Sequence, residues 1–359
     1  MTLEKELTSK LVVSTTYLYV HGEHLLRAVD VNLPPPATVQ YPVYLEDGTA
    51  TGQVLTEQSF GTWQRTQSLT CPYPPCINAV QRPIPQAGAI DVYQSAASSL
   101  YNGLTVSARN QMGRGLSFQM AYTFAKALDD GQDALVAGTP STVQNPYAIK
   151  TDRGLSTTDQ RQRFVLQGVA EPRPFHREQP ILRALLNNWK FSRVTTIGSG
   201  RPVTALVSGD ANADGNIGND RLPGLGRNSL VGPDYASTEL RVSRHIRLNA
   251  RYRLELMAEG FNIMNHDNKK ITTSDNGFTT TAADFQSGTY VVGSTMYPAR
   301  YVVNSQFMQA QSSYTPRQVP VFCASAVLTI DRALDLCREG CDSNRVQQGE
   351  FGGVTVWPK

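Results

Sequence analysis

Alternation of apolar and polar side chains is the main pattern along this chain. It is clearest in residues 116–124. The apolar positions there are Leu116, Phe118, Met120, Tyr122 and Phe124, and the small or polar ones are Ser117, Gln119, Ala121 and Thr123. A period of two predicts a β-strand with one apolar and one small polar face. Its length matches the roughly 9–11 residues that a tilted strand needs to cross a bilayer.

Other segments repeat this pattern. Residues 104–109 and 116–124, joined by a Gly-containing turn at 112–115, predict an antiparallel hairpin. Residues 240–248 are expected to pair with 252–259, where Arg253, Glu255 and Glu259 alternate with apolar side chains. Alternating charges are not tolerated in a dry core, so either this face is wet or the charges pair. Further strands are expected at 11–20, 163–170, 189–197, 204–207, 290–292 and 319–330.

The expected connections are asymmetric. The turn at Gly113 is short, whereas the connections 22–95, 129–160 and 265–316 are long. Structureless loops of that length are rare in compact soluble domains, and short turns at one end with long loops at the other are typical of outer-membrane barrels. A soluble β-sandwich with disordered insertions is the alternative.

Aromatic side chains fit both folds. They are Tyr17, Tyr19, Tyr122, Phe124 and Tyr252, at or near expected strand ends. In a barrel they would form girdles at the bilayer boundary, and in a sandwich they would pack in the core.

Composition and charge narrow the function classes. Of 359 residues, 40% are hydrophobic and only 18% are charged, and the net charge is +3. Without a basic patch, we expect no nucleic-acid partner. There is no apolar run of about 18 residues and no signal-peptide core at the N-terminus, which indicates either cytoplasmic residence or a missing N-terminal part. A β-barrel needs no such run.

Two cysteines lie close together in the chain. Cys71 and Cys76 could form a loop disulfide in an oxidising compartment, or remain two free thiols. Their spacing does not match a zinc site.

One loop resembles the first half of an EF-hand. Its oxygen-bearing residues are Asp210, Asn212, Asp214, Asn216 and Asp220, with Gly215 at the sixth position where the loop turns sharply. Arg221 stands where an EF-hand has its bidentate Glu. A structural Ca²⁺ is therefore one interpretation, and a turn held by its own Asn and Asp side chains is the other.

The sequence offers no support for an enzyme. There is no G-x-S-x-G elbow, no P-loop and no H-E-x-x-H motif, and nothing pairs a nucleophile with a base. We expect neither catalytic residues nor a cofactor, apart from the calcium interpretation.

A series of short blocks follows a fixed order along the chain. The blocks are 98–106, 114–118, 122–130, Asn145-Pro146-Tyr147, 152–156, Asp159, Arg161, Arg163-Phe164, Asn188-Trp189-Lys190-Phe191, Ser199-Gly200-Arg201-Pro202-Val203, 226–233, 258–266 and Pro316-Arg317-Gln318-Val319. In this order they resemble the C-terminal half of the barrel of Oar-like TonB-dependent outer-membrane receptors, and the resemblance runs from about Leu3 to Val319.

This resemblance implies an all-β, antiparallel transmembrane β-barrel, partial with about ten strands and with long extracellular loops. The barrel region would be 1–320, with Arg253, Glu255 and Glu259 facing the lumen, and 321–359 would be a divergent C-terminal tail. The implied location is the outer membrane of a Gram-negative-type cell. The implied partners are outer-membrane lipid, the TonB energy complex, a plug region and an unknown ligand.

The implied function is TonB-coupled uptake of a substrate. The chain carries no segment like the family's plug or signal, and its tail does not resemble the family's last strand, so we expect no active transport by this chain alone. The alternatives are a passive pore, a non-functional remnant, or a secreted β-rich adhesion module.

Overall fold

The computed structural model describes residues 1–61, 82–113, 115–131, 143–172, 187–247, 253–270, 280–287, 291–292, 295–296, 299–309, 312–313, 317–318 and 323–325. These residues are all β, apart from two short 3-10 helices, η1 (Pro85–Ala87) and η2 (Ile149–Asp152). No helix in the described part of the chain is long and apolar enough to cross a membrane.

The strands are β1 (Thr2–Thr8), β2 (Leu11–Asp30), β3 (Ala37–Tyr44), β4 (Ala50–Ser59), β5 (Asp91–Gly113), β6 (Leu116–Asp129), β7 (Gly154–Leu155), β8 (Gln162–Ala170), β9 (Trp189–Gly198), β10 (Pro202–Val203), β11 (Leu206–Ser208), β12 (Leu230–Val231), β13 (Tyr235–Arg247), β14 (Arg253–Gly260), β15 (Lys269–Lys270), β16 (Thr281–Gln286), β17 (Val291–Val292), β18 (Thr295–Met296), β19 (Arg300–Val303), β20 (Ser312–Ser313) and β21 (Cys323–Ser325).

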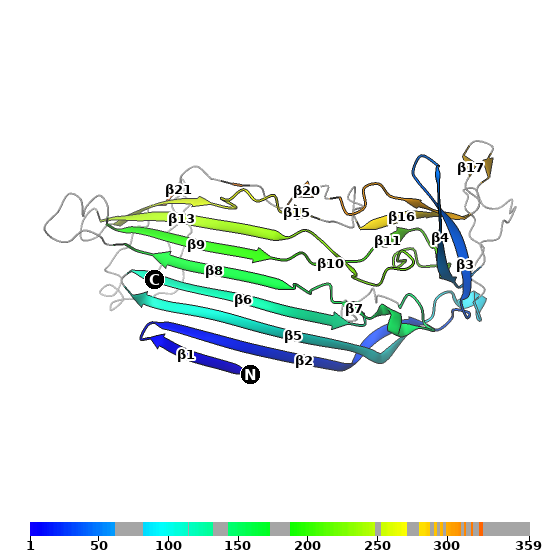
Figure 1. Cartoon of the computed structure of the whole chain (residues 1–359), viewed down its shortest axis with the longest axis horizontal. Helices are drawn as coiled ribbons and strands as arrows, with labels where there is room; N and C mark the ends of the chain where they lie inside the picture. Colours follow the sequence, from blue (N-terminus) through cyan, green and yellow to red (C-terminus); the bar gives the residue numbers. More distant parts are fainter. Residues whose placement is uncertain are drawn as a thin grey trace, which may run out of the picture.

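Ten strands form one antiparallel sheet, which we call the long sheet. Its order is β1-β2-β5-β6-β8-β9-β13-β14-β21, with β7 paired to β6. Figure 1 shows these strands running side by side along the length of the molecule. The edge strands β1 and β21 do not pair with each other in the described residues, so the sheet is open. The expected all-β, antiparallel architecture is confirmed, as an unclosed barrel sheet.

The two faces of the long sheet differ in chemistry. Residues opposite one another in paired strands share a face, and the register aligns Val106, Tyr122, Phe164 and Ile197 across β5, β6, β8 and β9. The apolar face carries Leu104, Val106, Met120, Tyr122, Phe124, Phe164, Leu166, Ile197 and Leu256. The polar face carries Ser14, Thr105, Ser107, Gln119, Thr123, Arg163, Gln167, Arg241, Glu255 and Glu259.

Hydroxyl and amide groups link neighbouring strands on the polar face. The Ser14 and Ser107 hydroxyls lie 2.8 Å apart, and those of Thr105 and Thr123 lie 2.9 Å apart. On the apolar face, by contrast, large side chains stay exposed, for example 40% of Met120. That face has no protein partner in the described residues, so it is the face suited to lipid.

The two ends of the long sheet also differ. Tight turns join β1 to β2 and β5 to β6, whereas long connections leave the opposite end. The strands run further than expected, because β2 continues to Asp30 and β5 begins at Asp91. The connection expected at 22–95 therefore spans only 31–90. The pairing continues past an irregularity after Gly22, and this break in the alternation hid the strand from pattern reading.

A second sheet lies at the long-connection end of the first (Figure 1). We call it the loop sheet, and its order is β11-β16-β19-β3-β4. The pairs β11/β16 and β19/β3 are parallel, unlike the antiparallel pairs that the sequence predicts throughout. The expected long loops 22–95 and 265–316 thus contribute strands to a sheet with its own core. That core comprises Tyr41, Val43, Val207, Ala211, Ala283, Phe285 and Tyr301.

Several expected strands appear with small shifts. The hairpin of β5 and β6 and the pairing of β13 with β14 are confirmed. Of the strand expected at 204–207, only residues 206–207 are in a strand, as part of β11, while β10 ends just before the expected start. The tail expected to diverge from residue 321 supplies β21, which pairs with β14. Cys71, Cys76, Tyr252 and most of the tail lie outside the described residues.

Candidate functional site

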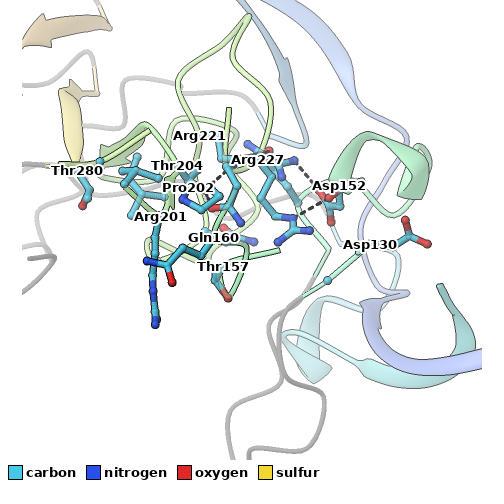
Figure 2. A pocket seen from close by; sticks show the side chains of 18 of the residues that line it. Asp130, Asp152, Thr157, Gln160, Arg201, Pro202, Thr204, Arg221, Arg227 and Thr280 are labelled. Atoms are coloured by element: carbon cyan, nitrogen blue, oxygen red, sulfur yellow. Dashed lines mark hydrogen bonds and ion pairs between the residues drawn. The ribbon is translucent and has the colours of Figure 1, made fainter. Parts of the chain in front are cut away.

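A cavity of about 990 Å³ lies where the long sheet meets its long connections. Arg27 at the end of β2, Arg163 at the start of β8 and Thr196 near the end of β9 contribute to its wall. The rest of the wall comes from Leu26 and Ala28 beside Arg27, from residues 130–131 after β6, from segments around η2, from 199–235 and from Lys269 and Thr280. Figure 2 shows part of this lining, with Arg221 and Arg227 directed toward Asp152.

A buried carboxylate organises one side of the cavity. Asp152, on η2, accepts hydrogen bonds from Arg27 Nη2 to Oδ2 at 3.2 Å and from Arg221 Nη2 to Oδ1 at 2.5 Å. All three side chains are buried. Removing one partner of such a network leaves a buried charge unpaired, which is strongly destabilising. The network therefore ties β2, η2 and the segment after β11 into one unit.

Arg227 extends this network. Its Nη2 forms an ion pair with Asp129 at the end of β6 and also donates to the Asp129 carbonyl oxygen at 2.7 Å. Its Nε donates to the Asp152 carbonyl oxygen at 2.7 Å. A Cβ added at Gly154 would lie 2.4 Å from the Arg227 carbonyl oxygen, so the close approach of these segments requires glycine there.

Asp130 is paired beside the cavity. It accepts hydrogen bonds from the Ser98 backbone N–H at 2.8 Å and from Arg153 Nη1 at 2.6 Å. Burial by itself would raise the pKa of Asp130, but the hydrogen bonds from Ser98 and Arg153 outweigh burial and lower it. Asp130 is therefore a carboxylate at neutral pH.

Another part of the wall, away from the Asp152 network, is formed by backbone contacts between the segments before β10 and after β12. Strands β10 and β12 pair there, and the Gly200 N–H donates to Asp234 Oδ1 at 2.8 Å. A Cβ added at Gly200 would lie 1.7 Å from the Gly232 carbonyl oxygen. A larger residue at Gly200 would push these two segments apart.

The cavity lining is rich in cations. Six cationic side chains line it, and three anionic ones do. The cations are Arg27, Arg163, Arg201, Arg221, Arg227 and Lys269, and the anions are Asp130, Asp152 and Asp234. The site therefore has a positive balance of charge.

The loop expected to bind calcium is folded around its own side chains. Asp210 accepts from the backbone N–H groups of Asp214 and Gly215 at 3.0 and 2.9 Å. Asp214 accepts from the Asn216 N–H at 2.7 Å, and Asn216 accepts from the Gly218 N–H at 3.1 Å. These are the local side-chain-to-backbone bonds of an Asx-rich turn.

Three carboxyl groups of this loop are buried together. Burial, followed by the repulsion of Asp214 and Asp210, raises the pKa of Asp220 to about 9. Burial is also the largest cause that raises the pKa of Asp214 to about 6. The Ala211 N–H donates to Asp220 Oδ2 at 3.1 Å, whereas Oδ1 has no hydrogen-bond partner within the described residues.

No group of three or more His, Cys, Asp or Glu side chains within the described residues has the arrangement to hold a metal ion. The calcium interpretation, which also uses Asn212 and Asn216, stays a prediction.

The residues expected to face the lumen belong to β14. Glu255 and Glu259 lie on the polar face, where Glu259 forms an ion pair with Arg241 and Glu255 lies 3.5 Å from His245. Arg253 begins the strand opposite Arg247. The two glutamates thus fit both earlier interpretations, because each lies beside a basic side chain and both pairs remain partly exposed, whereas the orientation of all three residues toward a lumen stays a prediction.

Pattern reading did not single out the Asp152 network. Its members lie far apart in the chain, and no spacing motif connects them. A signal was nevertheless present, because residues 152–156 and 226–233 are two of the blocks that carry the family resemblance. The structure brings these two blocks together at the cavity.

Comparison with known proteins agrees with this architecture. A family model described as an outer membrane beta barrel domain matches residues 1–224, which include β1 to β11. A search of curated proteins and a search of solved structures each gave no match. The matched part covers more than half of the chain and includes most of the long sheet, which indicates an outer-membrane location. The chain belongs to the family of outer-membrane β-barrel domains.

Proposed function

We propose that this chain is the barrel segment of a TonB-dependent receptor that takes up a substrate across the outer membrane. The proposal is supported by the ordered blocks that resemble Oar-like receptors and by the membership in an outer-membrane barrel family. Substrate would bind among the external connections, and a plug region displaced by TonB would release it into the periplasm.

One observation carries the proposal. The long connections do not simply cap the barrel, because they fold into the loop sheet and, with the strand ends, enclose a cavity of about 990 Å³. Ligand pockets are typically clefts of about 300–1,000 Å³. An ordered, concave site at the loop end is what a receptor needs to select a ligand, whereas a passive pore needs only an open lumen.

Paired strains that differ only in the TonB energy complex test this proposal. Cells that produce the protein are given labelled peptides, oligosaccharides and ferric siderophores. We expect one class to accumulate only when both the protein and the TonB complex are present. Uptake that is the same without the TonB complex would contradict the proposal.

A passive pore is the second candidate, because the polar face carries small hydroxyl groups and paired charges suited to a wet lumen. Planar-bilayer recordings separate the two. Steady open-channel steps from the purified protein would favour the pore, and a silent bilayer together with TonB-dependent uptake would favour the receptor.

A further inference from the structure

We propose that the cavity at the loop end binds a water-soluble ligand with phosphate or carboxylate groups. This inference deepens the proposed function, because it names the chemical class that the receptor's external site would select. It depends on the charge, pairing and burial of the side chains in the cavity wall.

The anions of the wall are already occupied. Asp152 binds two arginines, Asp130 binds Arg153, and Asp234 accepts a backbone N–H. Asp152 and Asp130 are therefore neutralised by arginines, whereas the exposed Asp234 has a partner for only one of its oxygens among the described residues. A cation entering the cavity would meet repulsion from the excess of arginine and lysine.

Three cations of the wall have no anionic partner among the described residues. Arg163, Arg201 and Lys269 form no ion pair with any described residue, although all three line the cavity. They come from β8, from the segment after β9 and from β15, so the fold converges them on one space. Clefts lined by one sign of charge raise the local concentration and the association rate of oppositely charged ligands.

Buried hydrogen-bond donors in the wall also favour a ligand that carries oxygen acceptors. The Arg227 side chain is 10% exposed, and its Nη1 has no hydrogen-bond partner in the part of the chain that the structure describes. The hydroxyl of Thr280, a buried residue that also lines the cavity, has none either. A buried donor without an acceptor is costly, and a ligand oxygen would supply the acceptor. Guanidinium groups bind carboxylate and phosphate oxygens with a planar fork of donors.

The orientation of the cavity favours a dissolved ligand over a lipid headgroup. Arg163 and Thr196 belong to the polar face, because the register aligns Arg163 with Thr123 and Thr196 with Ser237. Lipid would lie against the other face of the sheet. The cavity therefore receives its ligand from water.

Titration calorimetry on the full chain, folded in neutral detergent, tests this inference. The probes are inorganic phosphate and citrate, with maltose as a neutral comparison and spermidine as a cationic one. We expect phosphate or citrate to bind and the two comparison solutes not to bind. Failure of both anions to bind, or binding of maltose with equal affinity, would overturn the proposal.

Exposed side chains supply the variants, because they can change without disturbing the buried network. Each of the variants Arg163→Gln, Arg201→Gln and Lys269→Gln should weaken anion binding about tenfold or more. Arg109→Gln is the matched control for Arg163→Gln, since Arg109 lies on the same polar face but toward the turn end and outside the cavity. Equal losses for Arg109→Gln and Arg163→Gln would overturn the proposal, and far-ultraviolet circular dichroism verifies that each variant has folded.

Two further experiments distinguish a soluble ligand from a lipid headgroup, and the proposed ligand class from the proposed receptor function. Binding that appears only after anionic lipid is added to the detergent would identify a headgroup and overturn the soluble ligand. The calorimetry needs no TonB complex, so anion binding without TonB-dependent uptake would contradict only the receptor function. TonB-dependent uptake without anion binding would contradict only the ligand class.

Discussion

The long sheet and the loop sheet place their apolar side chains in opposite environments. On the long sheet, Met120 and Phe124 remain 40% and 49% exposed, whereas Tyr301 in the loop sheet is fully buried. Among the described residues, the apolar face of the long sheet therefore has no protein core against it, and it is the face suited to lipid. The loop sheet builds its core from side chains of this chain.

The two sheets should therefore respond to different perturbations. Backbone pairing holds the long sheet together, and an edge left open in lipid costs several kcal/mol per unpaired backbone group. The loop sheet depends on the packing of a few large side chains. Variants directed at one region should spare the other.

The largest effect is expected from Tyr301→Ala. Tyr301 packs edge-to-face against Tyr41 and Phe285, with ring centroids 6.0 and 5.3 Å away, and its hydroxyl donates to Glu57 Oε2 at 3.1 Å. Truncating such a buried aromatic costs about 3–5 kcal/mol. The near-ultraviolet circular dichroism of the aromatic cluster should collapse, while the far-ultraviolet signal of the long sheet persists.

Tyr93→Ala is the matched control for Tyr301→Ala, because Tyr93 is 54% exposed. Exposed substitutions usually change stability by less than about 0.5 kcal/mol. Equal loss of the near-ultraviolet signal in both variants would show that the loop sheet has no core of its own.

Met120→Arg tests the lipid-facing side of the comparison. Met120 lies midway along the apolar run from Leu116 to Phe124, which ends before Lys126. Arginine at the bilayer midplane costs about 2–4 kcal/mol in a transmembrane barrel. Urea titration in lipid vesicles should show this loss for Met120→Arg and a much smaller one for Gln119→Arg on the polar face. Similar losses for both variants would mean that neither face is reserved for lipid.

The buried carboxyl of Asp220 makes the loop sheet sensitive to pH. The pKa of Asp220 is about 9 in the folded chain and near 3.8 in the unfolded chain, so between these values only the folded state keeps the proton. Stability should therefore fall as the pH rises from about 4 to about 9, with a limiting slope of about 1.4 kcal/mol per pH unit. The pKa of Asp214, raised to about 6, adds to the slope only in the acidic part of this window.

Asp220→Asn should flatten that dependence, because an amide does not titrate and can still accept from the Ala211 N–H. The dependence of stability on pH is measured as the urea midpoint of unfolding at several pH values, with near-ultraviolet circular dichroism as the probe. An unchanged slope in the variant would assign the pH dependence to another group. Repeating the series with Ca²⁺ tests the calcium interpretation, since a bound cation would stabilise the ionised carboxylates and raise the midpoints at high pH.

The smallest effect is expected from Glu259→Gln on the polar face. Glu259 pairs with Arg241, and the two side chains are 30% and 52% exposed. Exposed ion pairs typically contribute about 0–1 kcal/mol, and salt screens them. Vesicle unfolding should change by less than about 1 kcal/mol. A loss of several kcal/mol would indicate a dry lumen around this pair.

Much of the long sheet was determined by local sequence. Alternation in 116–124 predicts β6 and its two faces, because the side-chain period of a strand is two wherever one face is apolar. The pairings of β5 with β6 and of β13 with β14 follow from short turns between alternating segments. The charged positions Glu255 and Glu259 were identified for the same reason.

Tertiary structure alone decided the loop sheet and the cavity. The strands β11, β16 and β19 are only three to six residues long, too short for periodicity to show. They pair with one another in that order, and β19 also pairs with β3 from the other end of the chain. The Asp152 network likewise joins Asp152 to Arg27, Arg221 and Arg227 across 69 to 125 positions of sequence. Ion pairs and burial depend on which residues lie close together in space. A single sequence gives the residue types but does not show which of them come into contact.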